Sequence, residues 1–191
     1  MNQTNPSPSE ELSPGIILVF YGAMALGAWY WAGGFGEGGG VSFRTADAKL
    51  PWALAEGIGF GLAVVGVTSV LLRASEALRR VAADIRQIIG RPGIVSIALI
   101  AAASSVGEEM LFRGAMQSAW GFAPTVVVFG FVHGLPGTRY WAWGVFAFVV
   151  GIGLGLMTLH TGSILAATLA HFTINYINLS RLVANRFDEF I

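Results

Sequence analysis

The sequence predicts an all-α protein, a polytopic transmembrane helix bundle of about six spans with a basic amphipathic helix on the membrane surface. The first observation is composition: 54% of the 191 residues are hydrophobic and 12% are charged, whereas ordinary soluble domains carry about 25% charged residues. The second is that long apolar stretches recur, and a helix of about 20 residues crosses the hydrocarbon core of a bilayer. The third is one arginine-rich interruption between two of these stretches.

Six apolar stretches give the order of the expected spans. The fourth is short for a span, so we expect it to be tilted or to begin in a re-entrant stretch. The 26 glycines of the chain fit helices that pack closely in lipid. The six stretches are Gly15–Phe35, Trp52–Leu72, Gly93–Gln117, Ala123–Gly134, Trp141–His160 and Ser163–Leu179.

The chain is expected to hold one domain with two short tails. Residues 1–14 are polar and contain three prolines, which predicts a flexible N-terminal tail. They contain no Lys or Arg, so the positive region of a cleavable signal peptide is lacking and none is expected. The transmembrane domain then covers residues 15–180, and residues 181–191 form a C-terminal tail.

The basic segment Arg73–Arg91 carries apolar residues at helical spacing between its arginines. This pattern predicts a basic amphipathic helix lying on the membrane surface; the alternative is a solvated basic loop. Either structure places the segment on the cytoplasmic side, because cytoplasmic loops carry the excess of Lys and Arg. Alternating spans then put both ends of the chain inside, in agreement with Arg139, Arg181 and Arg186, while Arg44 and Lys49 fall outside. The short chain and its single lysine favour a prokaryotic cytoplasmic membrane.

Several partners and cofactors are not expected. The formal net charge is zero, so nothing attracts nucleic acid. The chain has no cysteine, which excludes disulfides, a cysteine nucleophile and thiolate metal ligands. We expect membrane lipid and a membrane-anchored protein or peptide substrate as partners, with no cofactor and no metal. The sequence does not specify the oligomeric state.

Glu108, Glu109 and Arg113 follow directly on a strongly apolar stretch. A charge at membrane depth costs roughly 2.5–3.5 kcal/mol on insertion scales, so such a cluster marks a functional site by default. Glu109 and Arg113 are four residues apart and share a helix face, with the acid first, which is the favourable order. We therefore expect them to form a buried ion pair that leaves Glu108 free to accept a proton. The alternative is a packing network without chemistry.

Two further polar pairs lie in later apolar stretches. Phe129 and His133 are four residues apart, as are His171 and Asn175. A lone histidine is usually a satisfied core residue, and Asn and His often join helices in membranes. At a rise of about 1.5 Å per residue, Glu108, His133 and His171 fall in one layer roughly 8–16 Å below the outer boundary. That shared depth favours one site over three separate packing positions. We assign His160, near Ser163 as N-cap of the last helix, to a structural turn.

These three motifs, in this order on successive apolar segments, resemble the CPBP family of CAAX proteases and bacteriocin-processing enzymes, which includes glutamic-type intramembrane endopeptidases. The family pattern EExxxR, FxxxH and HxxxN matches Glu108-Glu109…Arg113, Phe129…His133 and His171…Asn175. Residues 161–166 are also similar to the family. The resemblance covers about residues 94–178, which would form the CPBP-like core.

The resemblance implies a metal-independent endopeptidase that cleaves near a lipidated or transmembrane C-terminal segment, or cleaves a peptide precursor. It implies that Glu108 and His133 activate a water and that His171 and Asn175 form the oxyanion hole. Glu109, Arg113 and Phe129 would support this geometry. Oxyanion donors in a site of low dielectric constant are each worth about 3–4 kcal/mol.

Two alternatives stay open. Glu108, His133 and His171 could supply a zinc site with two histidines, one glutamate and an open position for water, although no HExxH motif is present and Asn175 would then have no role. The chain could also be non-enzymatic, as a bacteriocin-immunity factor, a scaffold or a small transporter whose charged cluster binds an ion. Zinc in the purified protein would favour the first alternative, and biological function retained after Glu108→Ala would favour the second.

Overall fold

The computed structural model describes residues 13–34, 41–135 and 140–184. Every regular element within these ranges is helical, and no β-strand is present there. The fold class predicted from the sequence is confirmed. Four parts of the prediction lie outside the described residues: residues 1–12 of the expected tail 1–14, residues 185–191 of the expected tail 181–191, the loop at 136–139 with Arg139, and Phe35 at the end of the first stretch. Of the remaining tail residues, Pro14 begins the first helix and residues 181–183 belong to the last one.

Each predicted apolar stretch is found as a helix or as a run of joined helical elements. The bounds differ from the predicted ones by a few residues, except that the third stretch divides into three elements. In chain order the elements are α1 (Pro14–Trp31), η1 (Asp47–Lys49), α2 (Leu50–Ala74), α3 (Glu76–Ile89), α4 (Ile94–Glu109), η2 (Met110–Met116), α5 (Gln117–Trp120), α6 (Phe122–Gly134), α7 (Trp141–Thr161) and α8 (Leu165–Val183).

In the part of the chain that the structure describes, four helical segments are long and apolar enough to cross a membrane: Pro14–Trp31, Leu50–Ala74, Ile94–Trp120 and Trp141–Thr161. Helix α6 has 13 residues and is therefore about 20 Å long, too short to cross alone, in keeping with its predicted shortness. Helix α8 has 19 residues but carries the polar groups of the third motif. The protein is an integral membrane protein in which the six predicted stretches pack as one bundle.

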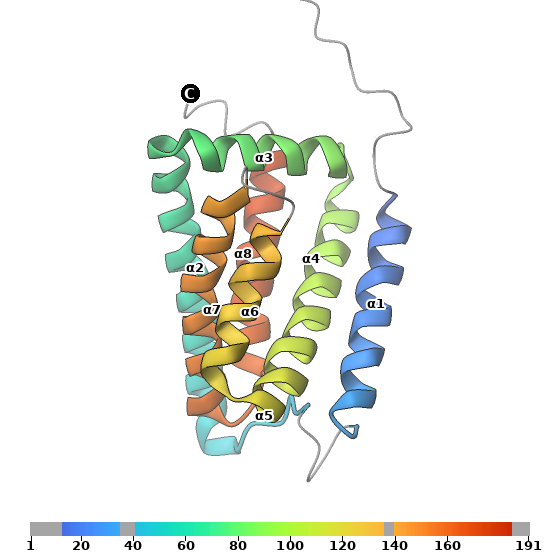
Figure 1. Ribbon diagram of the computed structural model, residues 1–191, viewed down its shortest axis with the longest axis vertical. Coiled ribbons are helices and arrows are strands. Elements are labelled where there is room, and N and C mark those ends of the chain that lie inside the picture. The colour runs from blue at the N-terminus through green and yellow to red at the C-terminus, as the bar shows by residue number, and fades with distance from the viewer. Residues whose placement is uncertain (1–12, 35–40, 136–139, 185–191) are drawn as a thin grey trace, which may run out of the picture.

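The helices run up and down the bundle, and α3 lies across one end of it (Figure 1). Helix α1 packs on the side of α4 and begins at the end where α3 lies, and α8 finishes at that same end. This arrangement agrees with the predicted alternation, in which both chain ends share a side with the basic segment.

Helix α3 confirms the predicted amphipathic helix. It spans Glu76–Ile89, which is shorter than the predicted segment Arg73–Arg91. Ser75 caps its first turn by accepting a hydrogen bond from the Leu78 amide (3.3 Å), as Ser commonly does. Arg79 donates to the last carbonyls of α2, those of Leu72 (2.9 Å) and Arg73 (3.0 Å). The two helices are thereby joined at a fixed corner. Arg73, expected in the amphipathic segment, belongs to α2.

Close packing of α2 on α8 sets the position of the last helix. Gly57 and Gly61 face α8, where an added Cβ would lie 2.6 Å from the Ala166 carbonyl oxygen and 2.9 Å from that of Ala170. Only glycine permits such an approach, which is how small residues bring helix backbones together in lipid. The contact holds α8 at the depth at which His171 meets α4.

The turn between α7 and α8 corrects one sequence expectation. Gly162 adopts a left-handed conformation with φ +71°, and Ile164, not Ser163, is the N-cap of α8. Ser163 still accepts a hydrogen bond from the Leu165 amide at 3.0 Å. His160 is exposed and pairs with Glu56 at 2.8 Å, which fits the structural role expected for it.

Candidate active site

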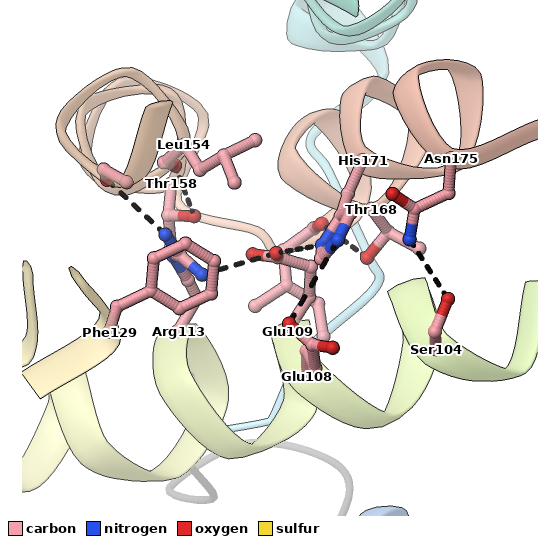
Figure 2. A network of polar contacts seen from close by, with 12 residues as sticks. Ser104, Glu108, Glu109, Arg113, Phe129, Leu154, Thr158, Thr168, His171 and Asn175 are labelled. Carbon is pink, nitrogen blue, oxygen red and sulfur yellow. Dashed lines mark hydrogen bonds and ion pairs between the residues drawn. The ribbon is translucent and has the colours of Figure 1, made fainter. Parts of the chain in front are cut away.

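The helix that carries the first motif changes its winding at the motif. Helix α4 ends at Glu109, and residues Met110–Met116 continue it as the π-helical turn η2. Such turns are rare and occur often at functional sites. The sequence predicted one continuous apolar stretch here, Gly93–Gln117, and gave no sign of a change in winding, although Gly107 and Gly114 lie within it. The wider turn carries Arg113, which it directs into the bundle beside Glu109 (Figure 2).

Glu109 and Arg113 form the expected buried ion pair. The Arg113 Nη1 atom donates to Glu109 Oε1 at 3.1 Å, and the two side chains are 1% and 0% exposed. Arg113 also donates through Nη2 to the Gly151 carbonyl of α7 at 3.3 Å. A buried guanidinium needs both partners, since an unpaired buried charge is strongly destabilising.

Glu109 has a second partner that the sequence did not predict. Its Oε1 accepts a hydrogen bond from His171 Nδ1 at 2.8 Å. The same oxygen already accepts a hydrogen bond from Arg113, so it acts as an acceptor here, and Nδ1 of His171 is the donor that carries the hydrogen. The Nε2 atom of that ring is directed toward Glu108, at 3.9 Å from its Oε2 (Figure 2).

Glu108 lies between the two histidines. Its Oε2 is 3.6 Å from His133 Nε2 and 3.9 Å from His171 Nε2. Both distances exceed those of a hydrogen bond, and this oxygen has no hydrogen-bond partner within the described residues. The structure thus brings together the three groups that the sequence placed at one depth, each from a different helix.

The tautomer of His133 is set by its own helix. Its Nδ1 lies 2.7 Å from the Phe129 carbonyl oxygen, and a carbonyl can only accept, so Nδ1 is the donor. In the neutral ring, Nε2 then presents a lone pair toward Glu108. Two proton acceptors therefore face each other across the 3.6 Å gap, an arrangement suited to a water molecule that donates to both.

Phe129 holds the charged groups and both histidines in place. Its ring is 2% exposed, and the Arg113 guanidinium carbon lies 4.2 Å from the ring centroid. The rings of His133 and His171 have centroids at 4.5 and 6.4 Å from the same ring. Cation–π contact with a desolvated guanidinium is worth about 2 kcal/mol, so Phe129 fixes the face of the site opposite Glu109.

Asn175 lies one turn after His171 on α8 and bonds to α4. Its Nδ2 donates to Ser104 Oγ at 2.9 Å, and Ser104 Oγ donates to the Ala101 carbonyl at 3.2 Å. An amide nitrogen carries two hydrogens, so one hydrogen of Asn175 is left for another acceptor.

A cavity of about 190 Å³ leads away from the polar groups. His133, His171 and Asn175 line it at one end, and Leu78, Ala82 and Ile85 of α3 line it at the other. Its remaining walls are mostly apolar side chains of α2, α7 and α8, together with Phe129 of α6 and the polar Thr68 and Asn178. The polar site is therefore continuous with a mainly apolar cavity, and α3 covers the other end of this cavity.

Two side chains at the site were missed by the sequence reasoning. Ser104 carries the signal that could have found it, since it lies four residues before Glu108 on the same helix face. Tyr21 of α1 carries no such signal. Its hydroxyl donates a hydrogen bond to the Glu108 carboxylate, and an added Cβ at Gly107 would lie 2.8 Å from the Tyr21 carbonyl oxygen. Only the packing of α1 on α4 brings this tyrosine to the site.

The arrangement can carry out general acid–base chemistry on a bound water, with hydrogen-bond donors beside it. Within the described residues, no group of three or more His, Asp or Glu side chains is placed to hold a metal ion.

Comparison with known proteins yields one match. Residues 90–177 match the family model of the Rce1-like type II CAAX prenyl endopeptidases, which confirms the resemblance of this segment to the CPBP family. The segment contains all the motif residues. No curated protein and no solved structure gives a significant match.

Proposed function

With residues 90–177 recognised as an Rce1-like CAAX prenyl endopeptidase segment, we propose that the chain is an intramembrane endopeptidase of the metal-independent glutamic type. Its substrate is a protein or peptide held in the membrane by a lipidated or transmembrane segment. The observation that carries the proposal is the meeting of Glu108, His133 and His171, from three helices, at the end of an apolar cavity.

The first step is attack by water. A water between Glu108 Oε2 and His133 Nε2 donates a hydrogen to each, and its oxygen attacks the carbonyl carbon of the scissile peptide bond. One proton passes to the Glu108 carboxylate as the new C–O bond forms. Proton transfer to a positioned side chain contributes typically 10²–10⁴-fold to the rate.

The second step is stabilisation of the oxyanion. The free N–H of Asn175 and the Nε2–H of His171 donate to it. Because Nδ1 of His171 donates to Glu109, Nε2 carries a hydrogen only in the imidazolium form. That charge is balanced, since the oxyanion and the Glu109 carboxylate then face one imidazolium and one guanidinium, while Glu108 holds the proton taken from the water. The intermediate collapses when the C–N bond breaks and Glu108 returns its proton to the leaving nitrogen.

The cavity supports an apolar substrate segment next to the scissile bond. Its walls are mainly apolar and it reaches from His133 to α3, so a prenyl chain, an acyl chain or apolar side chains would be buried there. Each CH₂ group removed from water contributes about 0.8 kcal/mol.

The test is cleavage by purified protein in detergent, with prenylated peptides, transmembrane-anchored proteins and unmodified precursor peptides as substrates. Wild type should cleave at least one class, and Glu108→Gln should reduce the rate by roughly 10²–10⁴-fold while the melting temperature stays close to that of wild type. The matched control is Glu56→Gln, which removes a carboxylate that pairs with His160 away from the site.

Three outcomes would contradict the proposal. If Glu108→Gln cleaves like wild type, Glu108 is not the base. If chelators abolish cleavage and zinc restores it, the reaction depends on metal. If no substrate class is cleaved while Glu108→Ala keeps its biological function in cells, the chain acts as a non-enzymatic membrane protein.

A further inference from the structure

Helices α4 and α8 run antiparallel, and besides the Glu109–His171 hydrogen bond they face each other in two polar pairs one helical turn apart. Glu108 of α4 lies opposite His171 of α8 (3.9 Å), and Ser104 lies opposite Asn175 (2.9 Å). Each pair of partners is four residues apart on its own helix, so both contacts lie on one face of each helix. Figure 2 shows the two contacts side by side along α4.

We propose that Ser104 is a positioning residue that orients the Asn175 amide toward the reacting carbonyl. This inference rests on the proposed function, because it assigns Ser104 a role through the oxyanion donor. Ser104 itself is 4% exposed and does not line the cavity, whereas Asn175 does.

The direction of the hydrogen bonds carries the argument. The hydroxyl hydrogen of Ser104 is committed to the Ala101 carbonyl, so toward Asn175 its oxygen can only accept. An amide that presented its oxygen to Ser104 would place two acceptors in contact. Ser104 therefore selects the amide orientation in which Nδ2 faces α4, and it uses one of the two N–H groups.

The remaining N–H is then fixed in direction, because the amide group is planar and its two hydrogens diverge at a set angle. Preorganised donors need no reorientation when charge develops, which is the source of their effect on rate. A chain of hydrogen bonds from Asn175 through Ser104 to Ala101 also strengthens its members in a site of low dielectric constant. Without Ser104, Asn175 would be free to rotate about χ2 and present its oxygen to the substrate.

The neighbouring residue supplies a matched control. Ser105 is 0% exposed, and its hydroxyl has no hydrogen-bond partner within the described residues. Ser104→Ala and Ser105→Ala remove the same hydroxyl group from adjacent buried positions on one helix. Ser104→Thr keeps the hydroxyl, and threonine in a helix can bond to a preceding carbonyl as Ser104 does.

The experiment measures kcat, KM and unfolding for these variants and for Asn175→Ala and the double variant Ser104→Ala/Asn175→Ala. One orienting hydrogen bond corresponds to about a three- to ten-fold loss of kcat, with KM unchanged. Ser105→Ala should keep the wild-type kcat, and Ser104→Thr should recover most of it. In the double variant kcat should be no lower than in Asn175→Ala alone, because Ser104 acts through that amide.

Other results would overturn the inference. If Ser104→Ala and Ser105→Ala have equal kcat, Ser104 does not orient Asn175. The same conclusion follows if the kcat of the double variant falls by the product of the two single losses. A fall in kcat that merely follows a fall in melting temperature shows a structural role only. If wild type cleaves nothing, the proposed function fails. The Ser104–Asn175 contact can then still be tested with the same variants, through their free energies of unfolding. Additive changes in the double variant would contradict the contact.

Discussion

At the scale of single residues, the two adjacent glutamates differ in their hydrogen bonds, although both face His171. Glu109 Oε1 accepts hydrogen bonds from Arg113 and from His171, whereas Glu108 Oε2 faces both histidines beyond hydrogen-bond distance. Two donors fix the position of the Glu109 carboxylate. Glu108, whose Oε2 has no hydrogen-bond partner among the described residues, is the carboxylate that we propose takes and returns a proton. Under this proposal, two chemically identical side chains divide the roles of base and support.

Glu109→Ala should destabilise the fold. It leaves the Arg113 guanidinium, 1% exposed, without its carboxylate, and breaking one partner of a buried pair costs about 3–5 kcal/mol. Unfolding in detergent measures the effect. The matched control is Glu76→Ala, which breaks a pair of the same i, i+4 spacing between exposed side chains of α3 and should change stability little. If Glu109→Ala lowers the free energy of unfolding no more than Glu76→Ala does, the buried ion pair does not stabilise the fold.

Asn175→Ala should lower kcat by roughly 10²–10³-fold with KM nearly unchanged, since an oxyanion donor acts mainly in the transition state. Asn178→Ala is the control, because Asn178 lines the same cavity one turn further along α8. Steady-state kinetics on the best substrate separate the two constants. A raised KM with kcat preserved would reassign Asn175 to substrate binding.

The four-residue spacings made part of the site predictable. The Glu109–Arg113 pair follows from spacing on one helix, and the shared depth of Glu108, His133 and His171 follows from the rise per residue. Contacts between helices do not follow from either. That Glu109 rather than Glu108 bonds to His171, and that Tyr21 reaches Glu108, depends on how far each helix is rotated and how closely α1 approaches Gly107. The roles of all these residues remain predictions.

At the scale of elements, apolar length and caps predicted the helices, but not the change of winding in α4. The segment Met110–Met116 contains Gly114, but a single glycine does not predict a π-helical turn. In the structure Arg113 of this turn bonds to Glu109 one turn earlier and to Gly151 of α7, and the contact with α7 is not readable from the sequence. Helix α3 was predictable from its arginines and apolar spacing. Its position over the cavity was not, because it depends on the corner at Ser75 and on the packing of Leu78, Ala82 and Ile85.

Ala82→Trp should narrow the cavity from its α3 end. A larger side chain in a filled space costs typically 1–3 kcal/mol, so KM for an anchored substrate should rise by about ten-fold while kcat changes little. Ala83→Trp places the same side chain on the exposed face of α3 and should leave KM unchanged. Kinetics on substrates with shorter and longer anchors make the comparison. Equal KM values in the two variants would show that the substrate does not occupy this cavity.

At the scale of the whole molecule, the family match covers the motif residues but only part of the cavity beside them. The matched residues 90–177 supply the polar groups from α4, η2, α6 and α8. Helices α2 and α3, outside the match, supply the glycines that position α8 and six of the residues that line the cavity. The polar groups of the proposed mechanism therefore lie in the matched segment, whereas the first half of the chain supplies part of the cavity wall where we propose that the substrate binds.

The charges of the bundle predict its orientation in the membrane. Arginines of α2, α3 and α8 gather at the end that α3 covers, and Arg44 and Lys49 lie at the opposite end, so the positive-inside rule predicts that α3 lies on the cytoplasmic side. The chain has no cysteine, which makes single cysteine variants unambiguous reporters. In sealed inverted vesicles, whose cytoplasmic face is outward, Ala83→Cys should react with an impermeant thiol reagent and Arg44→Cys should not; in right-side-out vesicles the pattern should reverse. Both side chains are exposed, so detergent should make both reactive. If only Arg44→Cys were labelled in inverted vesicles, the orientation of the bundle would be opposite to the predicted one. The cavity beneath α3 would then open toward the outer side of the membrane.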